Sequence, residues 1–161
     1  MAKKAVSDAV AARLAIYAGI FDGAHILDQN GLNILTNLSN PLLLASRYAL
    51  GLPAILRLNE TTQTPLDGGS WLRLEFPVAN DTQTILGRGY RETGAFRVAV
   101  ATEIGSGLAK SNTWCEQVAD IFRNQKFDGV DCRTPTTREG IDDGSYFIAA
   151  VIVPFRYEYR D

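Results

Sequence analysis

The stretch SYFIAAVIVPFRYEY, residues 145–159, decides the fold, because it carries the clearest strand pattern in the chain. Every second position from Phe147 to Tyr159 is apolar or aromatic, as in a strand with one face turned toward a core. The intervening positions are apolar in the first half and charged at Arg156 and Glu158 in the second. This pattern predicts a long strand whose first half is central in a sheet and whose second half is amphipathic.

The same period of two predicts further strands upstream, at 54–59, 71–78 and 94–101, and a short one at 130–133. Pro77 cannot donate to a ladder and indicates a sheet edge or a strand end. Residues 80–92 are polar and contain glycine, so we interpret them as a loop. The residues expected to face inward are Leu72, Leu74, Phe76, Val78, Phe96, Val98, Val100, Val151 and Val153.

Helical periodicity marks residues 5–18 and about 108–124, the second after the break at residues 105–107. Its apolar stripe is Trp114, Val118, Ile121 and Phe122, with Cys115 and Ala119 alongside. The order is helix, three strands, helix, two strands. It predicts a single α+β domain over residues 1–161, with an antiparallel or mixed sheet of about five strands and two helices packed on one face. Residues 19–53 contain several breakers and one candidate short helix at 42–50, and we interpret them as an extended insertion.

Length, composition and charge exclude several classes of protein. The chain has 161 residues, 46% of them hydrophobic, and a net charge of −2, which suits one globular domain and not a dedicated nucleic-acid binder. No apolar run approaches the roughly 18 residues of a membrane span, and the N-terminus does not form a secretory signal. Cys115 and Cys132 are too few for a disulfide framework, so we expect buried free thiols in a reducing cytoplasm.

The search for reactive chemistry favours a protein without catalytic, cofactor-binding or metal-binding residues. His25 is the only histidine, and beside Asp22 and Asp28 we interpret it as a solvated loop residue. The glycines at 87–89 and 105–107 complete no phosphate-binding fingerprint and are expected to be turns. Glu139, Asp142 and Asp143 lack the alternate spacing of a calcium loop and predict a turn before a strand.

One basic and aromatic patch is a candidate for contact with another macromolecule. Arg88 and Arg91 flank Tyr90 in the glycine-bearing segment. A phosphate contact is conceivable, but arginine and tyrosine are enriched at protein interfaces, so we favour a protein contact.

Three stretches together resemble a known family. They are residues 84–100 (TILGRGYRETGAFRVAV), the GSG turn at 105–107 leading into a helix that ends VADIF at 118–122, and GIDDGSY at 140–146 running into VIVPFRY at 151–157. Their order and spacing resemble the small tail terminator, or tail completion, proteins of long-tailed bacteriophages and prophages. The resemblance covers residues 5–18 and 54–159, whereas 19–53 is longer than the family pattern.

The resemblance implies a structural virion protein of the tail or neck, made in the host bacterial cytoplasm. Such proteins form a ring, typically a hexamer, that caps the head-proximal end of the tail tube, stops its polymerisation and presents a surface for head-tail joining. The implied partners are copies of the chain itself, the tail tube protein and a head-completion or stopper protein. DNA would pass through the lumen without specific binding, and the slightly negative net charge of the chain suits such passage. The resemblance implies no membrane contact and no cofactor.

A closed ring with head-to-tail contacts needs two different surfaces on each subunit. We take these from the 80–92 segment and from the end of the last strand; the candidate residues are Leu86, Arg88, Tyr90, Arg91, Tyr157 and Tyr159. Two alternatives stay open at this point: another neck component, such as a head-closure or adaptor protein, and a small enzyme or ligand-binding domain that uses His25 and the acidic turns.

Overall fold

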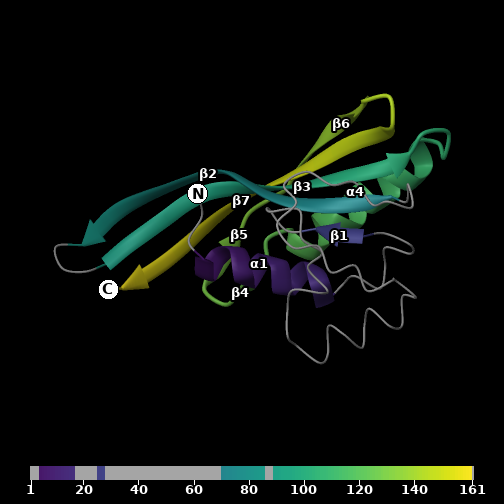
Figure 1. Ribbon diagram of the computed structural model, residues 1–161. Coiled ribbons are helices and arrows are strands. Elements are labelled where there is room, and N and C mark those ends of the chain that lie inside the picture. The colour runs from purple at the N-terminus through teal and green to yellow at the C-terminus, as the bar shows by residue number, and fades with distance from the viewer. Residues whose placement is uncertain (1–3, 17–24, 28–69, 86–88, 161) are drawn as a thin grey trace.

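The computed structural model describes residues 4–16, 25–27, 70–85 and 89–160, which form one sheet with two helices beneath it (Figure 1). The elements are α1 (Lys4–Ile16), β1 (His25–Leu27), β2 (Trp71–Ile85), β3 (Gly89–Glu103), α4 (Leu108–Phe122), β4 (Lys126–Phe127), β5 (Val130–Cys132), β6 (Thr136–Asp142) and β7 (Tyr146–Arg160). The predicted α+β class is therefore confirmed, with both predicted helices in place.

The sheet is built around β7, as the alternating pattern of residues 145–159 predicts. The seven strands have the order β1-β2-β3-β7-β5-β4, and β6 also pairs with β7. β3 and β7 are antiparallel over their whole length, from Gly89 opposite Arg160 to Glu103 opposite Tyr146. β1 runs parallel to β2, so the sheet is mixed. The described residues hold seven strands: the sequence patterns predict β2, β3, β5 and β7, whereas β1, β4 and β6 are short or polar and carry no strong sequence pattern.

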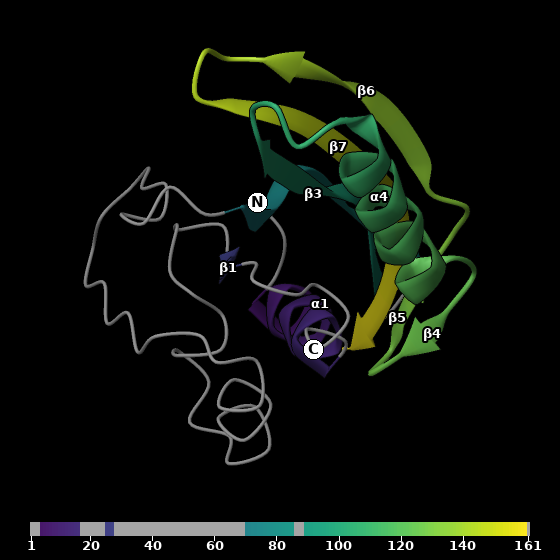
Figure 2. The same ribbon diagram turned by 90° about the vertical axis from the view of Figure 1, so that its right-hand side faces the viewer.

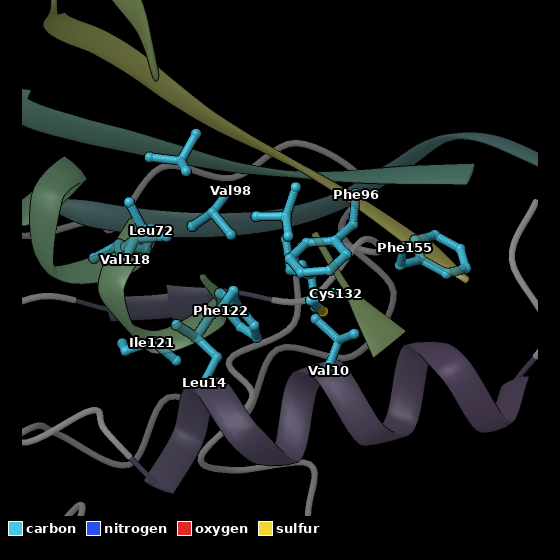
Figure 3. Packing of buried hydrophobic residues seen from close by; sticks show 14 of the residues in the cluster. Val10, Leu14, Leu72, Phe96, Val98, Val118, Ile121, Phe122, Cys132 and Phe155 are labelled. Atoms are coloured by element: carbon cyan, nitrogen blue, oxygen red, sulfur yellow. The ribbon is translucent and has the colours of Figure 1, made fainter. Parts of the chain in front are cut away.

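The main core lies between the sheet and the two helices, which cover the same face (Figure 3). α1 contributes Val10 and Leu14, and α4 contributes its predicted stripe; Phe122 meets Phe96 of β3 edge to face, with 4.9 Å between ring centroids. Seven of the nine residues predicted to face inward are buried in this cluster: Leu72, Leu74, Phe96, Val98, Val100, Val151 and Val153. Burial of each such side chain stabilises the fold by about 1.5–3 kcal/mol.

The opposite face of the sheet also carries a small buried cluster. It consists of Trp71, Ala99, Ala101 and Tyr146, and the rings of Trp71 and Tyr146 meet edge to face at 5.9 Å. The start of β7 is therefore covered on both faces, as its doubly apolar sequence predicts.

Arg13 joins the first helix to the end of the second. Its Nε donates to the carbonyl oxygen of Ile121 at 2.9 Å, and its guanidinium lies over the Phe127 ring at 4.8 Å. Ile121 lies in the last turn of α4, whose carbonyls have no partner within the helix and favour a cation. This contact fixes α1 against α4 and β4.

A bulge in β2 overturns the predicted inward orientation of Val78. The register between β2 and β3 shifts between Glu75 and Val78, around Pro77. Beyond this point the alternation reverses: Val78 is 49% exposed rather than buried, whereas Ala79 packs against the main core. β3 closely approaches the bulge at Gly94, where an added Cβ would lie 2.2 Å from the carbonyl oxygen of Val78.

The predicted loop at 80–92 is wrong over most of its length. Residues 80–85 complete β2 and residues 89–92 begin β3, and the two strands pair with each other. Both faces of this β2 segment are exposed at residues 80–84, so no hydrophobic alternation marks the strand in the sequence.

Two smaller differences concern the remaining elements. Glu139 belongs to the exposed strand β6, whereas Asp142 and Asp143 do form the predicted turn, by accepting hydrogen bonds from the backbone amides of Gly144 and Ser145. His25 begins the short strand β1 rather than lying in a loop. The predicted strand at 54–59 and helix at 42–50 lie outside the described residues.

Candidate functional site

A three-stranded arm projects beyond the helices at one end of the sheet (Figure 1). We define the arm as residues 80–85 of β2, 89–93 of β3 and 156–160 of β7. Antiparallel pairing holds it together, from Asn80 opposite Thr93 toward Ile85 opposite Gly89. β3 in turn pairs with β7 to its last residue, Arg160. The β3–β7 ladder is uninterrupted in the arm, whereas the β2–β3 ladder has one register shift between Gln83 and Ile85. Ladders on both sides of β3 therefore support a segment that contains little buried hydrophobic surface.

One face of the arm carries a ladder of three stacked tyrosines. The rings of Tyr90 and Tyr159 lie 5.4 Å apart at an interplanar angle of 16°, and those of Tyr157 and Tyr159 lie 5.9 Å apart at 19°. These are favourable stacking distances. All three side chains are partly exposed, so the ladder presents an aromatic surface to solvent.

The other face of the arm is charged. Arg91 Nη2 lies 2.8 Å from Glu158 Oε1, and Arg156 Nη2 lies 2.8 Å from Asp131 Oδ2. The hydrogen bond and the charge of Arg91, aided by Arg156 and Lys126, hold the pKa of Glu158 below its ordinary value. Solvent screens these pairs, so they contribute little to stability and instead set the pattern of charge on the arm.

The structure brings four of the predicted contact residues together. Tyr90 and Arg91 lie opposite Tyr159 and Glu158 in the register, and Tyr157 lies beside Tyr159 on the same strand. Leu86 and Arg88 lie outside the described residues. The two predicted segments therefore meet on one arm, with the three tyrosines on one face and Arg91 on the other, and their role in contact stays a prediction. Strand register between distant segments has no sequence signature of its own, so this juxtaposition could not be predicted.

The arm also has an open strand edge. Among the described strands, only β1 pairs with the outer side of β2, and it reaches from Trp71 to Arg73. Residues 78–85 (VANDTQTI) carry one charged side chain, that of Asp81. Long edges without lysine or a protecting proline are templates for pairing with another chain.

A groove at the opposite end of the molecule was not predicted from the sequence. Figure 2 shows α4 beside the strands β6 and β7. The groove between them has a volume of about 460 Å³. Its lining is Leu108, Asn112, Cys115, Thr137, Arg138, Glu139, Gly140, Phe147 and Ala149. No motif marks this groove, because its walls come from separate elements.

No group of three or more histidine, cysteine, aspartate or glutamate side chains within the described residues could hold a metal ion. Cys115 and Cys132 are both buried and free, as predicted. Burial raises the pKa of Cys115 to about 11 and that of Cys132 to about 12, so both thiols stay protonated at neutral pH. Within the described part of the chain, no helix is long and apolar enough to cross a membrane.

Comparison with known proteins decides the family. A family profile described as phage tail terminator protein matches residues 46–155, more than half of the chain. The chain belongs to the phage tail terminator family. The match includes β3, α4 and most of β7, and therefore includes the central strands from which the arm extends. The resemblance seen in the sequence is confirmed, and the protein has a structural role in the phage tail.

Structural comparison supports the fold alone. One solved structure, whose name states no function, is 17% identical to this chain and covers 100% of it, while 99% of that structure is covered in return. The TM-score is 0.60. None of the curated protein sequences compared with the chain matches it.

Proposed function

We propose that this tail terminator forms a ring that caps the head-proximal end of the tail tube, stops further addition of tube subunits and provides the surface on which the head is joined. The observation that carries this proposal is the projecting arm, with its open β2 edge on one side and the stack of Tyr90 on Tyr159 on one face. These features are suited to contact with other protein subunits rather than to binding a small molecule.

The chemistry of the arm supports a protein partner. Tyrosine and arginine are the residues that contribute most to contact energies at interfaces, and the arm presents Tyr90, Tyr159 and Arg91 within a few residues of one another. The edge of β2 offers main-chain hydrogen bonds in addition. A subunit of the ring or of the tube could use both.

The net charge of the chain supports the proposal that DNA slides through the centre of the ring. The net charge of the chain is −2, whereas a basic lining would bind phosphates and retain the DNA. We expect DNA to pass through without specific binding. The remaining partner is a head-completion or stopper protein of the neck, which would bind the face of the ring turned away from the tube.

Tube growth in the presence of the purified protein tests this function. Tube protein from the same phage is polymerised with and without the terminator, and tube lengths are measured by electron microscopy. We expect growth to stop, with a particle at one end of each tube. The exposed helix variant Thr113→Ala serves as a control and should stop growth equally well, since Thr113 lies outside the arm. Unchanged growth, or binding only to the portal side of the neck, would contradict the proposal.

A further inference from the structure

We infer that β6 of one subunit pairs with the outer side of β2 in a neighbouring copy of this chain, so that the sheets of successive subunits continue into one another. The part of β2 that receives β6 is residues 77–82, which we call the acceptor segment. This inference rests on the ring in the proposed function and names the two surfaces that close it.

Both strands have a side that no other described strand covers. β6 pairs with β7 alone, and the outer side of β2 pairs with β1 alone, which reaches no further than Arg73. All residues of β6 except Gly140 are exposed, and so are all residues of the acceptor segment except Ala79. The backbone amides and carbonyls along such exposed strands are a template for pairing with another strand.

The partner of each strand must come from a second copy. β6 lies at one border of the sheet and the acceptor segment at the other, with β7 and β3 between them. A sheet of these four strands cannot bring its own two borders together. Because the two borders are different surfaces, their contact is heterologous, and such contacts close into a ring when the rotation permits.

The topology of the sheet sets the direction of pairing. β2 is antiparallel to β3, β3 to β7 and β7 to β6. β6 therefore runs opposite to β2. A neighbouring copy that continues the sheet, with its strands in the same orientation, brings its β6 beside β2 in the antiparallel direction. This is the more stable of the two ways of pairing strands.

Two exposed apolar residues select the register. Val78 is 49% exposed and Ile141 is 74% exposed. Val78 points away from the main core, because its neighbour Ala79 packs against that core. Ile141 lies opposite Ile148, which packs against Trp71 and its cluster on the same outer face. Placing Val78 opposite Ile141 of the next copy covers both side chains, and such cross-strand pairs stabilise a sheet.

The bulge of β6 keeps the rest of this register consistent. From Arg138 to Ile141, β6 advances three residues while β7 advances two, so both side chains lie on the outer face. Val78, Asn80 and Thr82 share a face because strand residues alternate. With Val78 opposite Ile141, Asn80 therefore meets Arg138 of the neighbouring β6. The pairing stays clear of β1, which ends opposite Arg73.

The stagger between the two borders is compatible with a closed ring. Val78 lies level with Pro154 of β7, through Ala95, whereas Ile141 pairs with Ile148. The two levels are therefore about 20 Å apart along β7, at about 3.3 Å per residue. Four strands span about 19 Å at about 4.8 Å each. Strands tilted by about 45° to the ring axis cancel this stagger, which is close to the tilt found in closed sheets.

Disulfide trapping tests the register. The variant Val78→Cys, Ile141→Cys carries both cysteines in one chain, and residues directly opposite each other lie within the range of a disulfide. The native Cys115 and Cys132 are buried. After oxidation with copper phenanthroline, we expect a ladder of covalent oligomers on a non-reducing gel, reversed by dithiothreitol. The control Asn80→Cys, Ile141→Cys moves one cysteine two positions along the same face and should cross-link at least tenfold more slowly.

Single cysteines test whether the contact is head to tail. Val78→Cys alone and Ile141→Cys alone should each stay free of cross-links. An equal mixture of the two should give covalent dimers and nothing larger, because each chain then carries one reactive cysteine. Covalent dimers of Val78→Cys alone or of Ile141→Cys alone would show that like borders meet, and would overturn the inference.

A charge at the contact should weaken assembly without a change in fold. Ile141→Asp should lower association between subunits at least tenfold, measured by size-exclusion chromatography with light scattering, because the carboxylate would face Val78 of the next copy. The matched control is Ile104→Asp, at another exposed isoleucine that lies outside both strands. It should assemble normally. Circular dichroism and melting temperature should be unchanged in both variants.

The possible results distinguish this inference from the proposed function. If the unaltered protein forms no ring, alone or on tubes, the ring itself is refuted. If rings form, while the paired cysteines cross-link no faster than the control and Ile141→Asp assembles normally, the ring stands and the β6 contact is wrong. If Ile141→Asp forms rings that no longer bind tubes, β6 contacts the tube protein instead, which would also overturn the inference.

Discussion

The ring of Tyr90 lies over the ring of Tyr159, with 5.4 Å between their centroids and 16° between their planes. One residue comes from the first positions of β3 and the other from the last positions of β7. Their stacking on one face, with Arg91 paired to Glu158 on the opposite face, shows that two segments distant in the sequence build the arm together. The tyrosine ladder is therefore set by the strand register between distant segments, not by neighbouring positions in the sequence.

Removal of both aromatic rings tests that surface. The double variant Tyr90→Ala, Tyr159→Ala should stay folded, because the lost stacking costs about 0.5–1.5 kcal/mol. It should weaken association between subunits, or with tubes, at least tenfold, as measured by analytical ultracentrifugation and tube pull-down. Thr113→Ala is the matched control on an exposed helix position and should associate normally. Unchanged association of the double variant would show that the tyrosine ladder is not part of the interface.

Gly94 is predicted to be essential to the base of the arm. Gly94→Ala places a methyl group 2.2 Å from the backbone oxygen of Val78, and backbone cannot move aside as a flexible side chain can. We expect a loss of about 1–3 kcal/mol in the free energy of unfolding. Urea denaturation measures this loss, with the exposed neighbouring substitution Thr93→Ala as a control. Equal stability of the two variants would show that the bulge does not need glycine.

The buried thiols predict a loss of stability at high pH. Their pKa values are raised by burial to about 11 for Cys115 and about 12 for Cys132. The unfolded chain ionises near pH 9, so between that pH and the folded pKa values the unfolded state binds fewer protons and stability falls. Each thiol contributes about 1.4 kcal/mol per pH unit at most. Between pH 8 and pH 10.5, the urea midpoint of the double variant Cys115→Ala, Cys132→Ala should fall less steeply than that of the unaltered protein. Equal slopes of midpoint against pH in the two proteins would contradict this prediction.

Val151 tests the central position of β7. Its side chain is fully buried between the sheet and the helices. Val151→Ala should lower the free energy of unfolding by about 2 kcal/mol, since it removes buried methyl groups. Val151→Asp should prevent stable folding, because an unpaired charge in the core is very costly. Thr136→Asp, at an exposed position of β6, is the control, and a soluble, cooperatively folding Val151→Asp protein would refute the central strand.

The sequence predicts the parts of the fold in which periodicity and burial agree. Leu72 and Leu74, Phe96 and Val98, and the stripe from Trp114 to Phe122 all face the core as the patterns indicate. In these elements one face is apolar and the other polar, so the repeat distance reveals both the type of element and its buried side.

The arm and the groove could not be predicted, for physical reasons. Residues 80–84 are exposed, and without a buried face a strand has no alternation to detect. The bulge near Pro77 reverses the faces of β2, so Val78 follows the pattern and is nevertheless exposed. The groove joins residues such as Asn112 and Phe147, which only the tertiary fold places together.

Electron microscopy of tail tubes incubated with the purified protein tests the central claim most directly. We predict closed rings with an open centre, bound at one end of each tube and absent from its sides. The same rings should be found at the junction with the head in complete particles labelled with an antibody to this chain. Subunits that never assemble into closed rings, or rings located anywhere else on the virion, would contradict the proposed function.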